Sequence, residues 1–203
     1  MFVIVTLTML GYGLIHSWLA STHLKQYIRR LVGSQRYDGF YRLSYNLFAI
    51  VSLSPILGLI ILRPGGTVWQ ATGIPTVFLL IIQFIGLVGV MLSLLQIDLG
   101  QFLGLTQLMA YFKGQQLPLA DEPLQFNGVY RLVRHPLYVF SLLVIWPMSP
   151  MSESLLAFNV CTTIYFVVGS ILEERKLIAI YGEKYRAYQQ LTPAFIPFLK
   201  SLR

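Results

Sequence analysis

Polar side chains that could bind a ligand gather at two places in the last third of the chain. The first is the segment 127–138, in which Arg134-His135-Pro136 precedes Tyr138. Proline is favoured in the first turn of a helix, so this segment predicts a helix that starts at Pro136 with His135 near its N-cap. The backbone N–H groups at such a helix start attract an anion such as a carboxylate. Alternatively, the flanking arginines bind lipid headgroups.

The second place is the acidic pair Glu173-Glu174, which is followed by Arg175 and Lys176. If a helix ends here, two carboxylates oppose its dipole and a cation should compensate them. Arg175 and Lys176 could supply this charge, or a cationic ligand could. An anion site beside a cation site suits a zwitterion with an additional positive charge. S-adenosylmethionine, with its carboxylate, ammonium and sulfonium groups, is such a ligand.

Tyrosines accompany both places. Tyr130 and Tyr138 combine flat rings with hydroxyl groups. Tyr181, Tyr185 and Tyr188 recur at the spacing of one helical face. This spacing is typical of a surface helix packed under a bundle, and a lid over a nucleoside is the alternative.

The composition indicates that a membrane surrounds these residues. Of the 203 residues, 56% are hydrophobic and only 11% are charged, and the mean hydropathy is +0.66. An average soluble domain carries about 25% charged residues, so a soluble globular enzyme is excluded. The single cysteine, Cys161, excludes an internal disulfide framework and a cysteine-rich metal cluster. We expect no metal site.

Uncharged stretches long enough to cross a bilayer predict an all-α, polytopic integral membrane protein with about five transmembrane helices. These stretches lie at 1–20, 43–62, 76–96, 136–152 and 154–172. None contains a buried charge, which argues against a transport function. We expect a single membrane domain over 1–203, with N-terminal helices in 1–112 and a cofactor-binding part in 113–203. The segment 99–112 is either an interfacial helix or an extension of the third span.

The last two stretches predict a C-terminal helical hairpin over 136–172, with its tip at 147–153. From Pro136 to Pro147 is 12 residues, which is about 18 Å of helix. The hydrocarbon core is roughly 30 Å thick. The short arm therefore predicts a helix that begins below the membrane surface and opens onto a pocket. A tilted or kinked helix is the alternative.

Basic residues predict the orientation. With the N-terminus outside and five crossings, every lysine and arginine except Arg63 faces inward, as the positive-inside rule requires. We therefore expect a multi-pass protein of the bacterial inner membrane with a cytoplasmic C-terminal tail. The expected partners are the lipid bilayer and a small thiol or lipophilic acceptor, with no nucleic acid.

The ordered motifs of the region 127–197 resemble those of the isoprenylcysteine carboxyl methyltransferase superfamily of membrane S-adenosylmethionine-dependent methyltransferases. These motifs are Gly-Val-Tyr, Arg-His-Pro-x-Tyr, a membrane hairpin, Glu-Glu, Tyr-Gly-x-x-Tyr-x-x-Tyr and a final proline. The segments 16–21 (HSWLAS) and 98–105 (DLGQFLGL) are similar to the bacterial branch that holds the methanethiol S-methyltransferases and NnrU-like proteins.

The resemblance implies an S-adenosylmethionine site and assigns residues to it. The residues that would line or contact the cofactor are Leu124, Gln125, Tyr130, His135, Pro136, Leu137, Tyr138, Glu173 and Glu174. Either glutamate would bind the cationic end of the cofactor. His135, Glu173 and Glu174 are the candidate catalytic residues.

One departure from the superfamily bears on the acceptor. The eukaryotic prenylcysteine enzymes carry basic residues in the helical turn before the glutamates, whereas 165–172 has none here. A substrate carboxylate would lack a partner, and an unpaired charge at membrane depth is costly. We therefore expect a methyltransferase of class EC 2.1.1 that acts on a small or lipophilic acceptor, with a thiol favoured. The alternatives are an isoprenylcysteine-type carboxyl or lipid-amine methyltransferase and a non-catalytic NnrU-like membrane sensor or scaffold.

Overall fold

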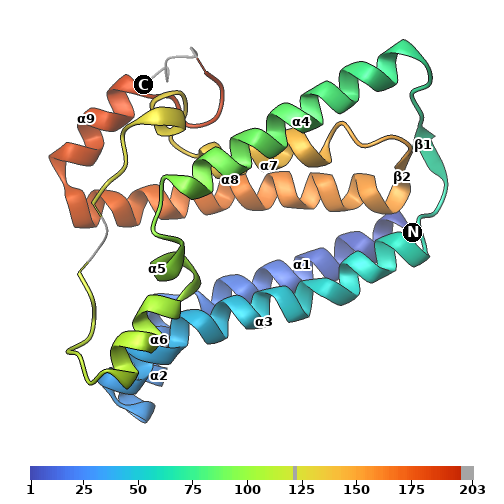
Figure 1. Cartoon of the computed structure of the whole chain (residues 1–203). Helices are drawn as coiled ribbons and strands as arrows, with labels where there is room; N and C mark the ends of the chain where they lie inside the picture. The colour runs from blue at the N-terminus through green and yellow to red at the C-terminus, as the bar shows by residue number, and fades with distance from the viewer. Residues whose placement is uncertain (121–122, 198–203) are drawn as a thin grey trace. The chain divides into compact units, whose positions relative to one another are not determined.

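The computed structural model describes residues 1–120 and 123–197, and most of these residues are helical (Figure 1). The prediction of an all-α polytopic membrane protein is confirmed. The chain divides into two compact units. Unit 1 contains Met1–Pro64 and the segment that starts at Asp98, and unit 2 contains Gly65–Ile97 and the segment that starts at Pro123.

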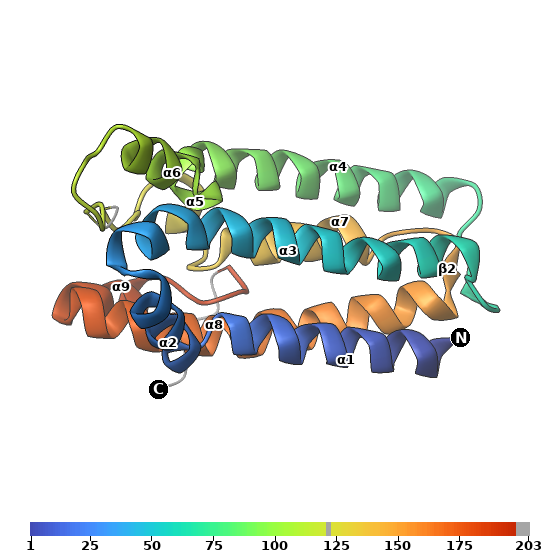
Figure 2. The same cartoon turned by 90° about the horizontal axis from the view of Figure 1, so that it is seen from below.

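Unit 1 is built on two long helices that lie side by side and are joined by a short one (Figure 2). Its helices are α1 (Phe2–Leu19), α2 (Thr22–Val32), α3 (Ser34–Leu62), α5 (Leu99–Leu103) and α6 (Leu105–Phe112). The hydroxyl of Ser21 caps α2 by accepting a hydrogen bond from the Leu24 N–H. Gly33 separates α2 from α3 with a φ of +86°, which glycine adopts without strain.

The third span ends at Leu95 and the segment 99–112 forms two separate helices, so the alternative that this segment extends the third span is wrong. Asp98 caps α5 by accepting a hydrogen bond from the Gln101 N–H. Gly104 ends α5 with a φ of +92°. A Cβ at Gly104 would lie 2.4 Å from the backbone nitrogen of Leu43. The chain therefore turns here and packs closely against α3.

Unit 2 holds the third and fourth long helices and the predicted hairpin (Figure 1). Its helices are α4 (Ile74–Leu95), the 3₁₀ helix η1 (Gly128–Arg131), α7 (Pro136–Ile145), α8 (Glu153–Tyr181) and α9 (Glu183–Leu191). Helices α4 and α7 approach closely because α4 carries glycines at the contact. A Cβ at Gly89 would lie 2.2 Å from the Phe140 ring, and one at Gly86 would lie 2.9 Å from the Leu143 backbone.

The hairpin has the unequal arms that the sequence predicts. Helix α7 has 10 residues, which is about 15 Å, whereas α8 has 29 residues, which is about 44 Å. Four described helices, α1, α3, α4 and α8, are long and apolar enough to cross a membrane. Helix α7 is a shorter fifth apolar helix. The protein is an integral membrane protein.

The tip of the hairpin is held by contacts that the sequence does not predict. Strand β2 (Met151–Ser152) pairs antiparallel with β1 (Thr67–Trp69). The Glu153 N–H donates a hydrogen bond of 2.9 Å to the carbonyl of Gly66. Inside the hairpin, the buried Asn159 side chain donates to the carbonyl of Ile145, where α7 ends. This amide satisfies a carbonyl group that the end of a helix leaves without an intrahelical partner.

Candidate functional site

Helix α7 begins as the sequence predicts, with His135 at the N-cap and Pro136 as its first residue. The segment that follows α9 holds this start in place. The Arg134 N–H donates to the carbonyl of Pro193 at 2.8 Å, and the His135 N–H donates to the carbonyl of Ala194 at 3.2 Å. The first turn of α7 forms one side of the candidate site.

Four residues predicted from the sequence lie together where α7 meets α8; we call His135, Tyr138, Glu173 and Glu174 the α7–α8 cluster. His135 Nε2 lies 3.0 Å from Glu174 Oε1. The Tyr138 hydroxyl donates to Glu173 Oε2 at 3.0 Å. His135 Nδ1 lies 3.7 Å from the same oxygen of Glu173. The histidine and both acids therefore face one another across the two helices.

Aromatic rings extend the cluster on both sides of His135. The rings of His135 and Tyr138 stack at 5.5 Å with an interplanar angle of 6°. Tyr138 stacks on Phe166 of α8 at 4.5 Å, and His135 stacks on Phe195 at 5.6 Å. The result is a column of four rings beside the two carboxylates. Aromatic faces carry negative electrostatic potential and attract cations.

The two glutamates have different environments. Glu174 Oε1 accepts hydrogen bonds from Arg134 at 2.7 Å and from His135, and Oε2 accepts from Gln189 at 2.6 Å. The Glu174 side chain is only 12% exposed, whereas that of Glu173 is 48% exposed. The charge of Glu174 is thus compensated inside the protein. Glu173 is the carboxylate of the cluster that remains accessible to a cation.

Three expectations about the charges of this region are wrong. Helix α8 continues to Tyr181, so Glu173 and Glu174 do not lie at its C-terminal end and do not oppose its dipole there. Among the described residues, Glu174 pairs with Arg134 rather than with the neighbouring basic side chains. The Arg134 side chain is 7% exposed, so it is an internal partner and not a lipid anchor.

Arg134 is the residue of this candidate site that the reasoning from sequence missed. Besides its bond to Glu174, its guanidinium donates to the backbone carbonyls of Gln189 and Thr192. One side chain thereby ties α8, α9 and the start of α7 together. Its position in the Arg-His-Pro motif is a signal, but its partner is 40 residues away along the chain.

Helix α9 packs two of the three regularly spaced tyrosines inward. Gly182, with a φ of +56°, separates α8 from α9, so Tyr181 ends one helix while Tyr185 and Tyr188 belong to the next. Tyr185 and Tyr188 are 1% and 6% exposed. Burial raises the pKa of both hydroxyls well above the usual range. The Tyr188 hydroxyl donates to the carbonyl of Tyr130. The burial of these two tyrosines favours a packed helix α9 over a lid.

The remaining predicted residues lie near the cluster in the chain. Pro136 is buried and Leu137 is half-buried in the first turn of α7. Tyr130 lies in η1, which starts at Gly128 with a φ of +58°. Leu124 and Gln125 are half-buried in the irregular segment before η1. Their role at the cofactor stays a prediction.

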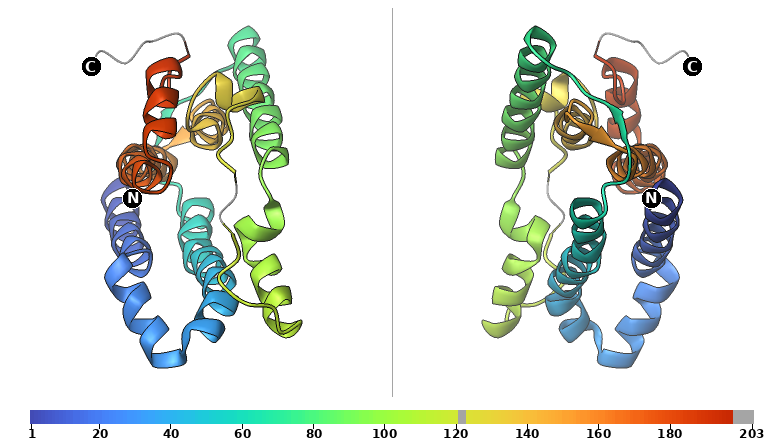
Figure 3. Two further views of the ribbon diagram at one scale, coloured as in Figure 1. Left: turned by 90° about the vertical axis from the view of Figure 1, so that its left-hand side faces the viewer. Right: turned by 90° about the vertical axis from the view of Figure 1, so that its right-hand side faces the viewer.

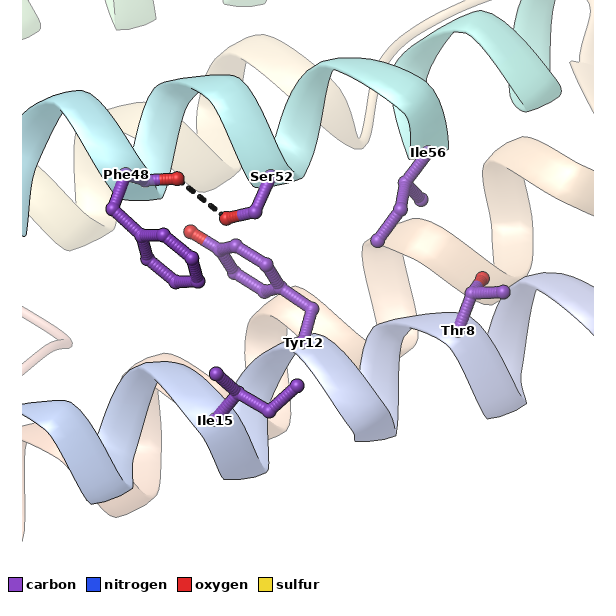
Figure 4. A pocket seen from close by; sticks show the side chains of 6 residues that line it. All are labelled: Thr8, Tyr12, Ile15, Phe48, Ser52 and Ile56. Atoms are coloured by element: carbon purple, nitrogen blue, oxygen red, sulfur yellow. Dashed lines mark hydrogen bonds between the residues drawn. The ribbon is translucent and has the colours of Figure 1, made fainter.

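Two further observations concern metal binding and pockets among the described residues. In 1–120 and 123–197, no group of three or more histidine, cysteine, aspartate or glutamate side chains is placed to hold a metal ion. A pocket lies between α1 and α3 of unit 1 (Figure 4), and the cluster does not line it.

Comparison with known proteins shows the family of this chain. The family model described as phospholipid methyltransferase matches residues 87–184. The methanethiol S-methyltransferase of Crocosphaera subtropica is 34% identical over 93% of this chain and 71% of its own length. Methanethiol S-methyltransferase 1 of Bradyrhizobium diazoefficiens is 33% identical over 98% of this chain and 68% of its own length. The methanethiol S-methyltransferase of Mycobacterium tuberculosis is 28% identical over 97% and 78%.

No solved structure matches this chain. The membrane helices and these relatives define an integral membrane methyltransferase. The chain belongs to the isoprenylcysteine carboxyl methyltransferase-like superfamily, in the branch that contains the methanethiol S-methyltransferases. The resemblance inferred from the motifs of 127–197 is confirmed.

Proposed function

We propose that this protein transfers a methyl group from S-adenosylmethionine to a small thiol, and that the α7–α8 cluster binds the methyl donor. The observation that carries the proposal is the accessible carboxylate of Glu173, which lies beside the stacked rings of His135 and Tyr138. The first turn of α7 begins at the same place. A site for a cation and a site for an anion are thus adjacent.

The residues present fit this donor. Glu173 would bind its cationic end, and the N–H group of Leu137 in the first turn of α7 would bind its carboxylate. The rings of His135 and Tyr138 offer flat apolar surface and negative potential. When bound, the donor supplies an activated methyl group on a sulfonium. We place Tyr130, Pro136, Leu124 and Gln125 at the edge of this site.

The other groups of the site act by orienting the reactants. Glu174 accepts a hydrogen bond from Nε2–H of His135 and thereby holds the ring with Nδ1 toward Glu173. Methyl transfer needs the nucleophile in line with the methyl carbon. Correct placement of the two reactants alone can supply a large part of the rate acceleration of an enzyme. Nδ1 of His135 and the Glu173 carboxylate are the groups that can accept the thiol proton.

A small thiol is the favoured acceptor for three reasons. A few per cent of a free thiol is already thiolate at pH 7, so it requires little activation. The helical turn 165–172 provides no basic partner for a substrate carboxylate. Three relatives with long matches are named methanethiol S-methyltransferases. The family model is named for phospholipids, and this favours a lipid amine as the second candidate acceptor.

We further propose an orientation and an organisation for the chain. With the N-terminus outside and the C-terminal tail in the cytoplasm of a bacterium, the positive-inside rule is satisfied at every base except Arg63. The part 113–203 of one membrane domain would then hold the cofactor at the cytoplasmic face of the inner membrane. There it would have access to the cellular pool of S-adenosylmethionine.

The test is transfer of a labelled methyl group by the full chain purified in detergent. Methanethiol, a farnesylcysteine analogue and phosphatidylethanolamine are offered as acceptors, and dimethyl sulfide is measured in the headspace. We expect dimethyl sulfide to be the dominant product and to disappear in Glu173→Gln but not in Glu183→Gln, which changes an exposed acid of α9. Dominant labelling of the lipid or the carboxyl acceptor would refute the thiol assignment. Donor binding without any transfer would favour a sensor or scaffold and refute catalysis.

A further inference from the structure

Unit 1 contains a pocket that methyl transfer by unit 2 does not explain. It has a volume of about 180 Å³ and lies between two membrane helices, lined by Thr8, Tyr12 and Ile15 of α1 and by Phe48, Ser52 and Ile56 of α3 (Figure 4). The hydroxyl of Ser52 donates to the carbonyl of Phe48 at 2.6 Å, and that of Thr8 donates to the carbonyls of Ile4 and Val5. Because these protons are already used within each helix, the pocket suits an apolar occupant.

A series of rings connects this pocket to the start of α3. Tyr12 stacks on His16 at 5.4 Å, and His16 contacts Tyr45 at 4.7 Å with its Nδ1 2.9 Å from the tyrosine hydroxyl. Tyr45, Tyr41 and Tyr37 then follow one another along α3, at 6.4 Å and 4.6 Å. Tyrosine is enriched at membrane–water interfaces, where its ring is apolar and its hydroxyl is hydrated. This series indicates that the start of α3 lies at the headgroup level.

Basic side chains gather at the same level. Lys25, Arg29 and Arg30 belong to α2, and Arg36 and Arg42 belong to the start of α3. Asp38 pairs with Arg29 at 2.8 Å and is the only acid between residues 21 and 42. This level therefore carries a net positive charge.

Helix α2 has the features of a helix that lies in the interface. It joins α1 to α3 at one end of unit 1 (Figure 3). Its apolar residues Tyr27 and Leu31 are spaced one helical turn apart and are 60% and 66% exposed. Arg29 and Arg30 lie between them in the sequence and supply positive charge to the helix. Amphipathic helices with basic polar faces bury such apolar residues at the boundary between headgroups and acyl chains.

The depth of the pocket matches an acyl chain that extends from this level. The Tyr41 hydroxyl donates to the carbonyl of Leu19, which sets the end of α1 beside that turn of α3. From Leu19, Ile15 is about 6 Å and Thr8 about 17 Å along the helix axis. Half of the hydrocarbon core is about 15 Å thick. The pocket therefore covers the depth that one leaflet's acyl chains occupy.

We propose that unit 1 binds one anionic phospholipid, with its phosphate at the basic residues of α2 and of the start of α3 and one acyl chain in the α1–α3 pocket. The basic residues select the headgroup charge, since arginine binds phosphate through paired N–H groups. The pocket retains the chain because its lining presents apolar surface. This binding site is separate from the methyl-transfer proposal, and it can be tested without any measurement of activity.

Native mass spectrometry of the full chain, delipidated in detergent, tests the headgroup part. The probes are phosphatidylglycerol and phosphatidylcholine with identical acyl chains. We expect one phosphatidylglycerol to be retained at about tenfold lower lipid concentration than phosphatidylcholine. Arg30→Gln/Arg36→Gln should abolish this preference, because each basic residue near an anionic headgroup contributes a factor of about five. Arg30→Lys/Arg36→Lys should largely keep it. Equal retention of the two lipids by the wild-type protein would overturn the proposal.

A pair of serine variants tests the acyl-chain part. Ser52→Phe fills the pocket, whereas Ser54→Phe adds the same side chain at an exposed position of α3 that does not line it. Thermal unfolding in detergent establishes that both variants fold. We expect Ser52→Phe to lose retention of phosphatidylglycerol at least tenfold and Ser54→Phe to retain it. Undiminished retention by a folded Ser52→Phe, or an equal loss in both variants, would contradict the placement of the chain.

Discussion

His135 Nε2 lies 3.0 Å from Glu174 Oε1, and this contact joins the first turn of α7 to α8. A carboxylate only accepts hydrogen bonds, so Nε2 must carry the proton. The ring is thereby held with Nδ1 on the side of Glu173, at 3.7 Å from its carboxylate. The adjacent glutamates consequently have separate tasks: Glu174 positions His135 and Arg134, and Glu173 is accessible to a ligand.

Removing the charge of Glu174 should destabilise the protein. Glu174→Gln leaves the guanidinium of Arg134 buried without its ionic partner, and breaking such a pair costs about 3–5 kcal/mol. The measurement is thermal or denaturant unfolding in detergent. Glu183→Gln is the control because its pair with Arg186 is exposed and worth about 0–1 kcal/mol. Equal stability of the two variants would show that the buried pair does not hold α8 to the start of α7.

The hydroxyl and the ring of Tyr138 should contribute separately to donor binding. Tyr138→Phe removes the hydrogen bond to Glu173 and keeps the ring between His135 and Phe166. A lost hydrogen bond of about 0.5–1.5 kcal/mol weakens binding about two- to tenfold. Tyr138→Ala also removes the stacking and should weaken binding further. Calorimetric titration with S-adenosylmethionine distinguishes the variants; wild-type affinity in Tyr138→Phe would mean that the hydroxyl does not position Glu173.

The contact between α4 and α7 should tolerate no side chain at Gly89. The added methyl of Gly89→Ala would lie 2.2 Å from the ring of Phe140, and such overpacking costs about 1–3 kcal/mol. Gly169→Ala on α8 is the matched control, since nothing lies within 4 Å of its Cβ position. That substitution should stabilise the helix by up to about 1 kcal/mol. The midpoints of unfolding in detergent should therefore shift in opposite directions for the two variants. An unchanged midpoint for Gly89→Ala would contradict the close approach of α4 and α7.

The buried tyrosines of α9 should make stability fall at high pH. Burial raises the pKa of Tyr185 and Tyr188 in the folded protein. Above about pH 10 the unfolded chain loses these protons while the folded protein keeps them. The contribution of these two tyrosines to the free energy of unfolding should thus be constant below about pH 10 and should decrease above it. Tyr185→Phe should make the decrease shallower in unfolding midpoints measured from about pH 8 to 11.5; an unchanged slope would contradict the burial of this hydroxyl.

The sequence predicts the features that local rules determine. Pro136 marks the start of α7, and the absence of charge marks the long helices. The distribution of basic residues requires the hairpin, whose tip lies between Pro147 and Glu153. The predicted end of α8 is wrong because the change from apolar to charged residues at Glu173 marks the end of the apolar span and not the end of the helix. Residues 175–181 contain no glycine or proline, and the first glycine, Gly182, is where α8 ends.

The features that the sequence does not predict depend on contacts between distant segments. Arg134 reaches Glu174 across 40 positions. The break at Gly104 follows from the close approach of the Leu43 backbone. Strands β1 and β2 are three and two residues long, too short to produce an alternating pattern. Each of these contacts requires the fold to be known first.

The central claim is that Glu173 binds the cationic end of the methyl donor, and calorimetric titration of the purified full chain with S-adenosylmethionine tests it most directly. Glu173→Gln should weaken binding about tenfold to a hundredfold, the value of a charge-assisted contact, with its unfolding midpoint unchanged. Glu183→Gln, the same change at an exposed acid of α9, should bind as the wild-type protein does. Wild-type affinity in Glu173→Gln would contradict the claim.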